Sequence, residues 1–124
     1  MKVEVSNGEI LDKLSILEIK LNNIKDKSKI ENVAKEHAVL SEIVSHIPGS
    51  PLALYNDLKI VNEELWEIED EIRVKEKDKK FDQEFVALAR SVYVTNDRRA
   101  EIKKKINIYT GSELLEEKSY ESYS

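Results

Sequence analysis

Apolar residues recur at alternating steps of three and four positions through four segments of the chain. The first segment shows the pattern clearly, with Ile10, Leu14, Leu17, Leu21 and Ile24. On an α-helix this spacing keeps the side chains on one face, so each segment is expected to form an amphipathic helix that buries this face against the others. The predicted helices span residues 7–26, 29–47, 51–78 and 82–110.

Capping residues support three of these helix starts. Ser6 and Glu9 have the spacing of a capping box, in which the serine hydroxyl accepts a hydrogen bond from the glutamate amide. Ser50 precedes Pro51, a residue favoured at the first helical position, and Asp82 precedes the last segment. Each is therefore expected to be the N-cap of its helix.

Short connections between the segments predict an all-α fold, an antiparallel up-down bundle of four helices in a single domain over residues 1–124. The third and fourth helices, at roughly 42 Å, are longer than the first two, at roughly 30 Å. They should form a coiled-coil-like hairpin whose end projects past the other pair. Apolar residues at this end, including Ile72 and Phe85, need a cover, and we expect a second copy of the chain to provide it in a homodimer.

The two ends of the chain have weaker patterns. Residues 1–5 alternate apolar and polar and would suit a short strand, pairing with residues 106–109 if those are not helical. The tail, residues 112–124, has no apolar face of its own, so it is expected either to dock on the bundle or to be mobile.

Composition narrows the classes of function. The chain of 124 residues has no cysteine, which excludes disulfides, thiolate metal sites and a cysteine nucleophile. Its net charge is -5, with 20 basic residues scattered among 25 acidic ones, whereas nucleic-acid affinity needs clustered positive charge. No apolar run approaches the roughly 20 residues of a membrane span, and the start is too polar for a signal peptide. We therefore expect a cytoplasmic protein without membrane or nucleic-acid partners.

Polar residues interrupt the apolar face of the fourth helix between Val92 and Ile102. In the first helix Glu18 points toward the buried side, and in the second a histidine occupies an apolar position. Aligning the four helices brings these residues to nearly one height, which predicts a polar layer in the core. The predicted layer consists of Glu18, His37, Glu64, Thr95, Asn96, Arg99 and Lys103.

The polar layer has three interpretations. Because an isolated buried ion is costly, Arg99 needs an acidic partner, for which Glu18 is the first choice and Glu64 the second. The favoured interpretation is structural, with the layer fixing helix register. The alternative is a site for a small anionic ligand, such as a phosphorylated sugar or nucleotide, anchored by Arg99 and Lys103 with Glu18 or His37 as acid-base group. The third is exposure of these residues at a cleft.

Known chemical motifs are weak or missing. Glu63, Glu64 and Glu67 match half of the magnesium motif of helical nucleotide pyrophosphohydrolases, but the second half is absent. The basic residues from Arg98 to Lys105 are interleaved with acids, which favours internal ion pairs over nucleic-acid binding. The sequence has no phosphate-binding glycine loop, nucleophile elbow or zinc-type histidine pair. We assign no catalytic, cofactor-binding or metal-ligating residue.

Three stretches of the sequence resemble the signature of an uncharacterised family of short helical proteins from bacteria and their phages. They are NGEILDKLSILEIK at residues 7–20, TNDRRAEIKKKIN at 95–107 and GSELLEEKSY at 111–120. The resemblance covers nearly the whole chain, and Glu18, Asn96 and Arg99 lie inside these stretches.

The resemblance implies no chemistry, because the family has no established activity. Its members occur beside surface-polysaccharide and glycosyltransferase genes, which suggests by association an accessory role in glycan assembly or a phage-encoded modifier of the host. The leading hypothesis is a non-enzymatic interaction module that acts as a homodimer or on a protein partner, in the host cytoplasm if phage-encoded. The alternative is the anionic-ligand site in the polar layer, with no cofactor implied by either.

Overall fold

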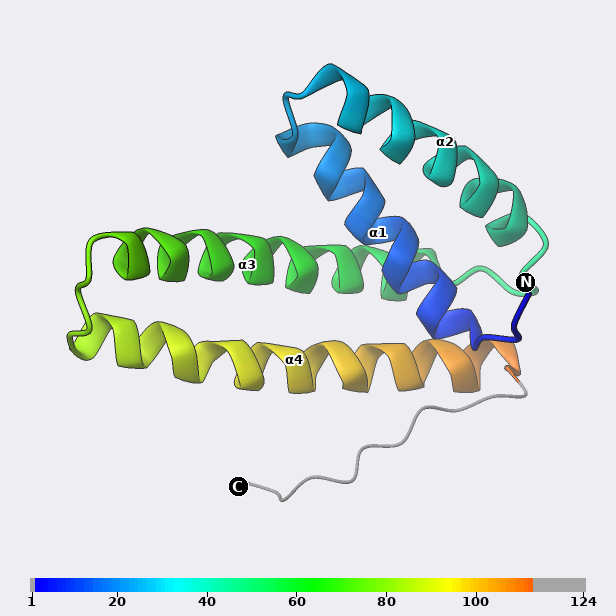
Figure 1. Ribbon diagram of the computed structural model, residues 1–124. Coiled ribbons are helices and arrows are strands. Elements are labelled where there is room, and N and C mark those ends of the chain that lie inside the picture. Colours follow the sequence, from blue (N-terminus) through cyan, green and yellow to red (C-terminus); the bar gives the residue numbers. More distant parts are fainter. Residues whose placement is uncertain (1, 113–124) are drawn as a thin grey trace.

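The computed structural model describes residues 2–112 and contains four helices connected by short loops (Figure 1). These are α1 (Asn7–Asn23), α2 (Lys27–Val44), α3 (Leu52–Lys77) and α4 (Gln83–Thr110). The predicted all-α helical bundle is confirmed, and each predicted boundary lies within three residues of the observed one. Residues 2–5 form no strand, and the expectation for the tail falls outside the described residues from position 113 onward.

The helices are arranged as two antiparallel hairpins, one crossing the end of the other. α1 packs against both α3 and α4, while α2 packs along α1 and contributes no buried residue (Figure 1). The α3–α4 hairpin is the longer one, and its half nearest the connecting turn extends well beyond α1. α2 therefore depends on α1 for its place in the fold.

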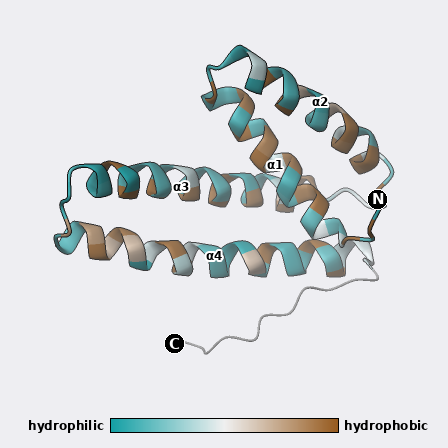
Figure 2. Ribbon diagram, viewed as in Figure 1, coloured by the Kyte–Doolittle hydropathy of each residue, from teal (hydrophilic) through white to brown (hydrophobic). Residues whose placement is uncertain are grey.

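The hydrophobic core lies where α1 crosses the α3–α4 hairpin. Leu11, Leu58 and Ile106, one from each of the three helices, are at most 2% exposed. The partly buried residues packed around them are Val44, Ile47, Leu54, Tyr55 and Ile102. Figure 2 shows hydrophobic residues on α1 and the last turns of α2 near this crossing, and a second hydrophobic region at the start of α4 near the projecting end.

Of the N-caps predicted for α3 and α4, only the one for α4 is observed. Asp82 caps α4 as expected, since its carboxylate accepts a hydrogen bond of 2.9 Å from the Phe85 amide. The predicted Ser50 cap is wrong, because α3 begins after Pro51 and no side chain caps it. Proline has no amide hydrogen to satisfy, so this helix start needs less from a capping side chain.

The start of α1 is held directly against α4. The Ser6 hydroxyl accepts from the Glu9 amide at 3.2 Å, which confirms this half of the capping box. The Gly8 amide donates to the Asn107 side-chain oxygen at 2.6 Å, so a residue of α4 satisfies an amide that has no partner within α1. A Cβ added at Gly8 would lie 2.5 Å from the Lys103 carbonyl oxygen. Only glycine therefore allows the two backbones to approach this closely.

We expect Gly8→Ala to lower the free energy of unfolding by roughly 2 kcal/mol, because the added methyl group pushes α1 away from α4. Helix propensity alone predicts the opposite sign, since alanine inside a helix is favoured over glycine by about 0.5–1 kcal/mol. Urea unfolding followed by circular dichroism measures the difference.

Gly111→Asn is the control for this variant. Gly111 has a φ of 70° but no atom within 4 Å of an added Cβ, and asparagine tolerates this backbone conformation. It should change the stability by well under the loss in Gly8→Ala. Equal or greater stability of Gly8→Ala relative to the wild type would contradict the close approach.

Candidate functional site

A buried carboxylate, that of Asp12 on α1, is the centre of the polar interior. Asp12 is 1% exposed and faces Arg99 on α4 in a bidentate arrangement. Arg99 Nε donates to Asp12 Oδ1 at 2.9 Å, and an Arg99 terminal nitrogen donates to Oδ2. Asn62 Nδ2 on α3 donates to Oδ1 at 2.9 Å. Three helices thus meet at one carboxylate.

Further polar side chains surround this pair. Ser15 Oγ accepts from Asn62 Nδ2 at 2.7 Å and donates to the Asp12 carbonyl oxygen at 2.7 Å. Lys103 Nζ lies 3.9 Å from Asp12 Oδ2 and donates to Glu9 Oε2 at 2.6 Å. We call this set the Asp12 network; its members are Glu9, Asp12, Ser15, Asn62, Asn96, Arg99 and Lys103.

The Asp12 network is internally satisfied. Within residues 2–112, every buried side-chain nitrogen or oxygen has a hydrogen-bond partner. A buried ion pair is compatible with a stable fold only when its geometry is good and additional hydrogen bonds occupy the remaining lone pairs. The Asp12 carboxylate meets this condition, because Arg99 and Asn62 both donate to it.

The predicted partner of Arg99 is wrong. Neither Glu18 nor Glu64 contacts it; Asp12 does, and Glu64 pairs instead with Arg98 at 2.8 Å on the surface. The alignment that favoured Glu18 assumed helices running nearly side by side. α1 crosses the α3–α4 hairpin obliquely (Figure 1). Gly8, Glu9 and Asp12 in its first half contact α4, whereas Glu18 contacts Tyr55 and Lys59 of α3.

Three other residues of the predicted layer do lie beside Arg99. Asn96 accepts a hydrogen bond of 3.4 Å from the guanidinium, and Thr95 and Lys103 are 5% and 7% exposed. The interruption in the apolar pattern of α4 therefore located this side of the polar interior correctly.

Sequence reasoning missed the members on α1 and α3. Ser15 follows the core residue Leu11 by four positions, so it shares the buried face of α1, a signal available in the sequence. Asp12 directly follows Leu11 and Asn62 directly follows Val61, both apolar residues of the core. No signal in the sequence distinguishes these two residues from the many exposed acids and amides. Their burial results from the crossing of the helices.

Glu18 and His37 belong to a second group, on the side of α1 that faces α2 and the start of α3. Glu18 accepts hydrogen bonds from the Tyr55 hydroxyl and from Lys59 Nζ, the latter at 3.1 Å. His37 Nε2 lies 3.8 Å from the same carboxylate, and its other ring nitrogen is 3.4 Å from Ser41 Oγ. We call Glu18, His37, Tyr55 and Lys59 the Glu18 cluster. The side chains of Glu18, His37 and Lys59 are each 28–29% exposed.

The electrostatics of the Glu18 cluster favour the ionised carboxylate. Burial raises the pKa of Glu18. The hydrogen bonds from Tyr55 and Lys59 and the nearby positive charge lower the pKa by more than burial raises it, so the pKa of Glu18 lies below its ordinary value of 4.5. Burial and the neighbouring carboxylate both raise the pKa of Tyr55. The tyrosine is therefore a hydrogen-bond donor at neutral pH and has no tendency to ionise.

Neither group has the composition of a metal centre. Among the described residues, no three histidine, cysteine, aspartate or glutamate side chains converge at a distance suited to a metal ion. No helix in residues 2–112 is long and apolar enough to cross a membrane.

Residues 1–123 match a family of unknown function, DUF6165. The chain belongs to the DUF6165 family. Comparison with curated proteins gives no match, and comparison with solved structures gives none either. The family assignment confirms the resemblance to an uncharacterised family. The matched residues include all members of the Asp12 network and of the Glu18 cluster.

We expect Arg99→Ala to lower the free energy of unfolding by about 3–5 kcal/mol, because it leaves the Asp12 carboxylate, 1% exposed, without its bidentate partner. Asp12→Ala should cost less, because the Arg99 side chain is 28% exposed. The double variant should lose less than the sum of the two, which a double-mutant cycle by urea unfolding measures.

The matched control is the exposed pair of Arg98 and Glu64, whose side chains are 54% and 41% exposed. Removing either member should cost under about 1 kcal/mol. Similar losses from the two pairs would contradict the central place of Asp12.

The lowered pKa of Glu18 predicts part of the acid sensitivity of the fold. Since its pKa in the folded state is below 4.5, the unfolded chain takes up the proton first as the pH falls. The contribution of Glu18 to stability is therefore present above pH 4.5 and is lost as the pH falls through the pKa of Glu18 in the folded state. Glu18→Gln should flatten the dependence of the free energy of unfolding on pH between about 5 and 3.

Glu31→Gln, on the exposed face of α2, is the control for this measurement and should leave that dependence unchanged. A slope in Glu18→Gln that equals the wild-type slope would show that the cluster makes no such contribution.

Proposed function

We propose that this DUF6165 chain is a non-enzymatic helical interaction module whose docking surface is the projecting half of the α3–α4 hairpin. The observation that supports this most directly is the apolar surface of this half. Val74 near the end of α3, Phe81 in the turn and Val86 at the start of α4 are 59%, 56% and 54% exposed. Figure 2 shows hydrophobic residues at the start of α4 in this half of the hairpin. Exposed apolar side chains that gather in one region are typical of protein-binding surfaces.

The shape of the hairpin supports the same proposal. A groove of about 680 Å³ lies between α3 and α4 in this half, with Val74, Ala87 and Leu88 among its lining residues. Two packed helices leave apolar side chains uncovered on both faces of their contact, and α1 covers only the other half of the hairpin. A partner helix or hairpin of coiled-coil type fits this groove.

The Asp12 network supports a structural role for the polar interior. An anionic ligand anchored by Arg99 would have to displace the Asp12 carboxylate, which already holds the guanidinium in a bidentate pair. It would also place a second negative charge beside a carboxylate that is 1% exposed. These costs favour the interaction module over the alternative of a site for a phosphorylated sugar or nucleotide.

The sequence resemblance supports a bacterial or phage origin for this module, and the polar start of the sequence supports a cytoplasmic setting. We therefore propose that the chain acts in the cytoplasm of a bacterium, or of the bacterial host where a phage encodes it. There it would act as an accessory protein through contacts with itself or with another protein.

A photo-crosslinking amino acid at position 74, in cells that natively express the chain, tests the docking surface. We expect ultraviolet light to join this variant to a protein of defined mass, because the Val74 side chain lies in the groove that the partner covers. The same amino acid at the exposed position Val39 of α2 is the control and should give no such adduct. Gel mobility and mass spectrometry identify the product.

Two outcomes would contradict the proposal. The first is the absence of any adduct at position 74. The second is a rise in melting temperature with inorganic phosphate, a sugar phosphate or a nucleotide that is lost in Arg99→Lys, which would support the anionic-ligand site instead.

A further inference from the structure

The charges are segregated along the second half of α3 and the turn that follows it. The nine positions from Glu63 to Glu71 contain six acids and no base, and the following nine positions, 72–80, contain five bases and two acids. The acids of the first block are Glu63, Glu64, Glu67, Glu69, Asp70 and Glu71. The bases of the second are Arg73, Lys75, Lys77, Lys79 and Lys80. We call these the acidic block and the basic block.

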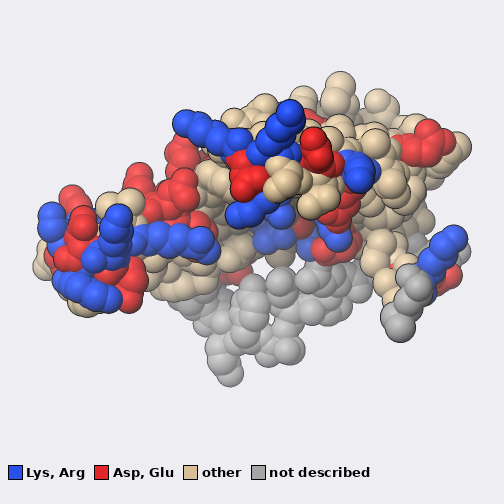
Figure 3. All heavy atoms as spheres, turned by 45° about the horizontal axis from the view of Figure 1, so that its top comes forward, with Lys and Arg blue, Asp and Glu red and all other residues tan. Residues whose placement is uncertain are grey.

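Most of these charges have no partner within the described part of the chain. In the acidic block only Glu64 forms an ion pair, with Arg98. In the basic block the ion-paired residues are Lys75 and Lys79, so Arg73, Lys77 and Lys80 form none with residues 2–112. Figure 3 shows side chains of both signs crowded over the projecting end of the hairpin. The two blocks therefore present opposite charges to solvent side by side.

The apolar groove described above lies at the boundary between the two blocks. Asp70 and Glu71 of the acidic block and Lys75 of the basic block line it together with Val74. Val74 is 59% exposed beside the groove, and Phe81, in the turn that follows α3, is 56% exposed. Uncovered apolar side chains of this kind are typical of a protein-binding surface.

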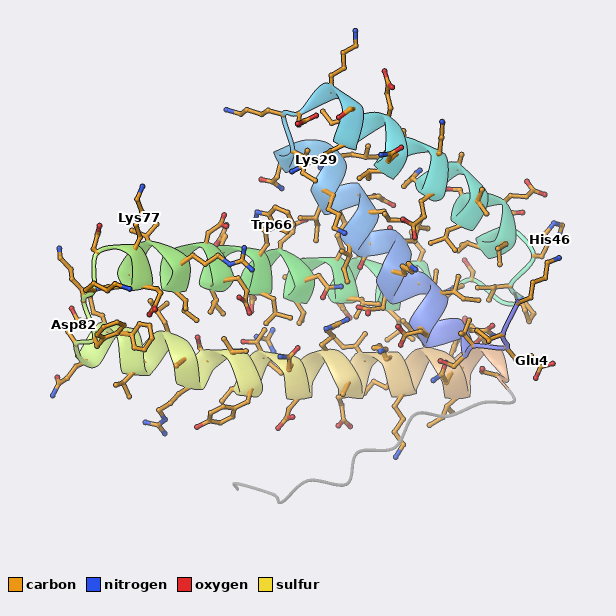
Figure 4. The ribbon with its side chains drawn as sticks, in the orientation of Figure 1. Glu4, Lys29, His46, Trp66, Lys77 and Asp82 are labelled. Atoms are coloured by element: carbon orange, nitrogen blue, oxygen red, sulfur yellow. The ribbon has the colours of Figure 1, made fainter. Side chains whose placement is uncertain are left out.

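We propose that the occupant of this groove is a second copy of the chain, packed antiparallel about a two-fold axis near Ile72. This inference rests on the proposed function, for which it names the partner. Such an axis brings the acidic block of each copy beside the basic block of the other. Glu67 and Lys77 are equally distant from Ile72 in the sequence, so Glu67 of one copy faces the partner's Lys77. The Lys77 side chain points away from α4 into open space, where a partner can reach it (Figure 4).

The symmetry of the charge pattern is the reason for choosing a second copy. A two-fold interface joins the same patch on both subunits, so the patch must be complementary to itself. A block of acids followed at once by a block of bases meets this requirement in the antiparallel orientation and not in the parallel one. An unrelated partner would be matched by a surface of one sign, and nothing would require the reversal near Ile72.

Charge reversal tests the pairing directly. At about 100 μM and low salt, where screening is weak, light scattering of the wild type should give twice the chain mass of 14.3 kDa. Glu67→Lys and Lys77→Glu should each raise the dissociation constant at least about tenfold, because each places like charges opposite one another. An equal mixture of the two variants should recover the dimer, since both cross-pairs are then of opposite sign.

Lys35→Glu on the exposed face of α2 is the matched control and should leave the mass unchanged. A second measurement uses the absence of cysteine from the chain. Val74→Cys, close to the proposed axis, should be joined to its counterpart by a short bismaleimide crosslinker, which spans more than the roughly 7 Å of a disulfide, whereas Val39→Cys on α2 should not.

Three results would overturn the inference: a monomeric mass at about 1 mM in low salt, a mixture of the two variants that stays monomeric, or a loss of dimer in Lys35→Glu equal to that in Glu67→Lys. These results do not by themselves contradict the proposed function. A monomeric chain whose position 74 crosslinks to a protein of another mass would keep the interaction module and remove the homodimer.

Discussion

The position of α1 depends on one ion pair, between the buried carboxylate of Asp12 and the partly exposed guanidinium of Arg99. Apolar packing is not directional, so Leu11, Leu58 and Ile106 alone would tolerate several crossing positions of α1 over the hairpin. The bidentate pair joins residues 87 positions apart in the sequence and has only one satisfactory geometry. A shift of α1 by one turn would leave the Asp12 carboxylate buried without its bidentate partner. The pair therefore selects one arrangement among those that the apolar core permits.

This arrangement separates the part of the molecule that stabilises the fold from the part that is available for binding. α1 covers the half of the hairpin nearest its open end, and α2 follows α1 away from the surface of α3 and α4. The half nearest the turn at residues 78–82 keeps an apolar groove and unpaired charges. A binding surface at that end lies apart from the core residues Leu11, Leu58 and Ile106.

The sequence predicts the helices well because their periodicity is a local property. A step of three or four residues is the same in any helical arrangement, and Ser6 and Asp82 act within a few residues of their own helix. The crossing angle between hairpins is not local, and it decides which acid reaches Arg99. Glu18 would reach Arg99 if all four helices ran side by side, whereas the oblique crossing brings Asp12 to it. Likewise, the sequence shows the polar interruption in the apolar face of α4, but it does not show that Asp12 of α1 lies against this interruption.

The orientation of α1 requires a second anchor, because one ion pair allows a helix to pivot. Gly8 supplies it, through the hydrogen bond of its amide to Asn107 and its close approach to the backbone at Lys103. Asn107 and Arg99 are eight residues apart on α4, about 12 Å along its axis, while their partners on α1 are four residues apart, about 6 Å. Two contacts at this separation fix both the position and the direction of α1. Since α2 is held by α1, the same two contacts determine which half of the α3–α4 hairpin is left uncovered.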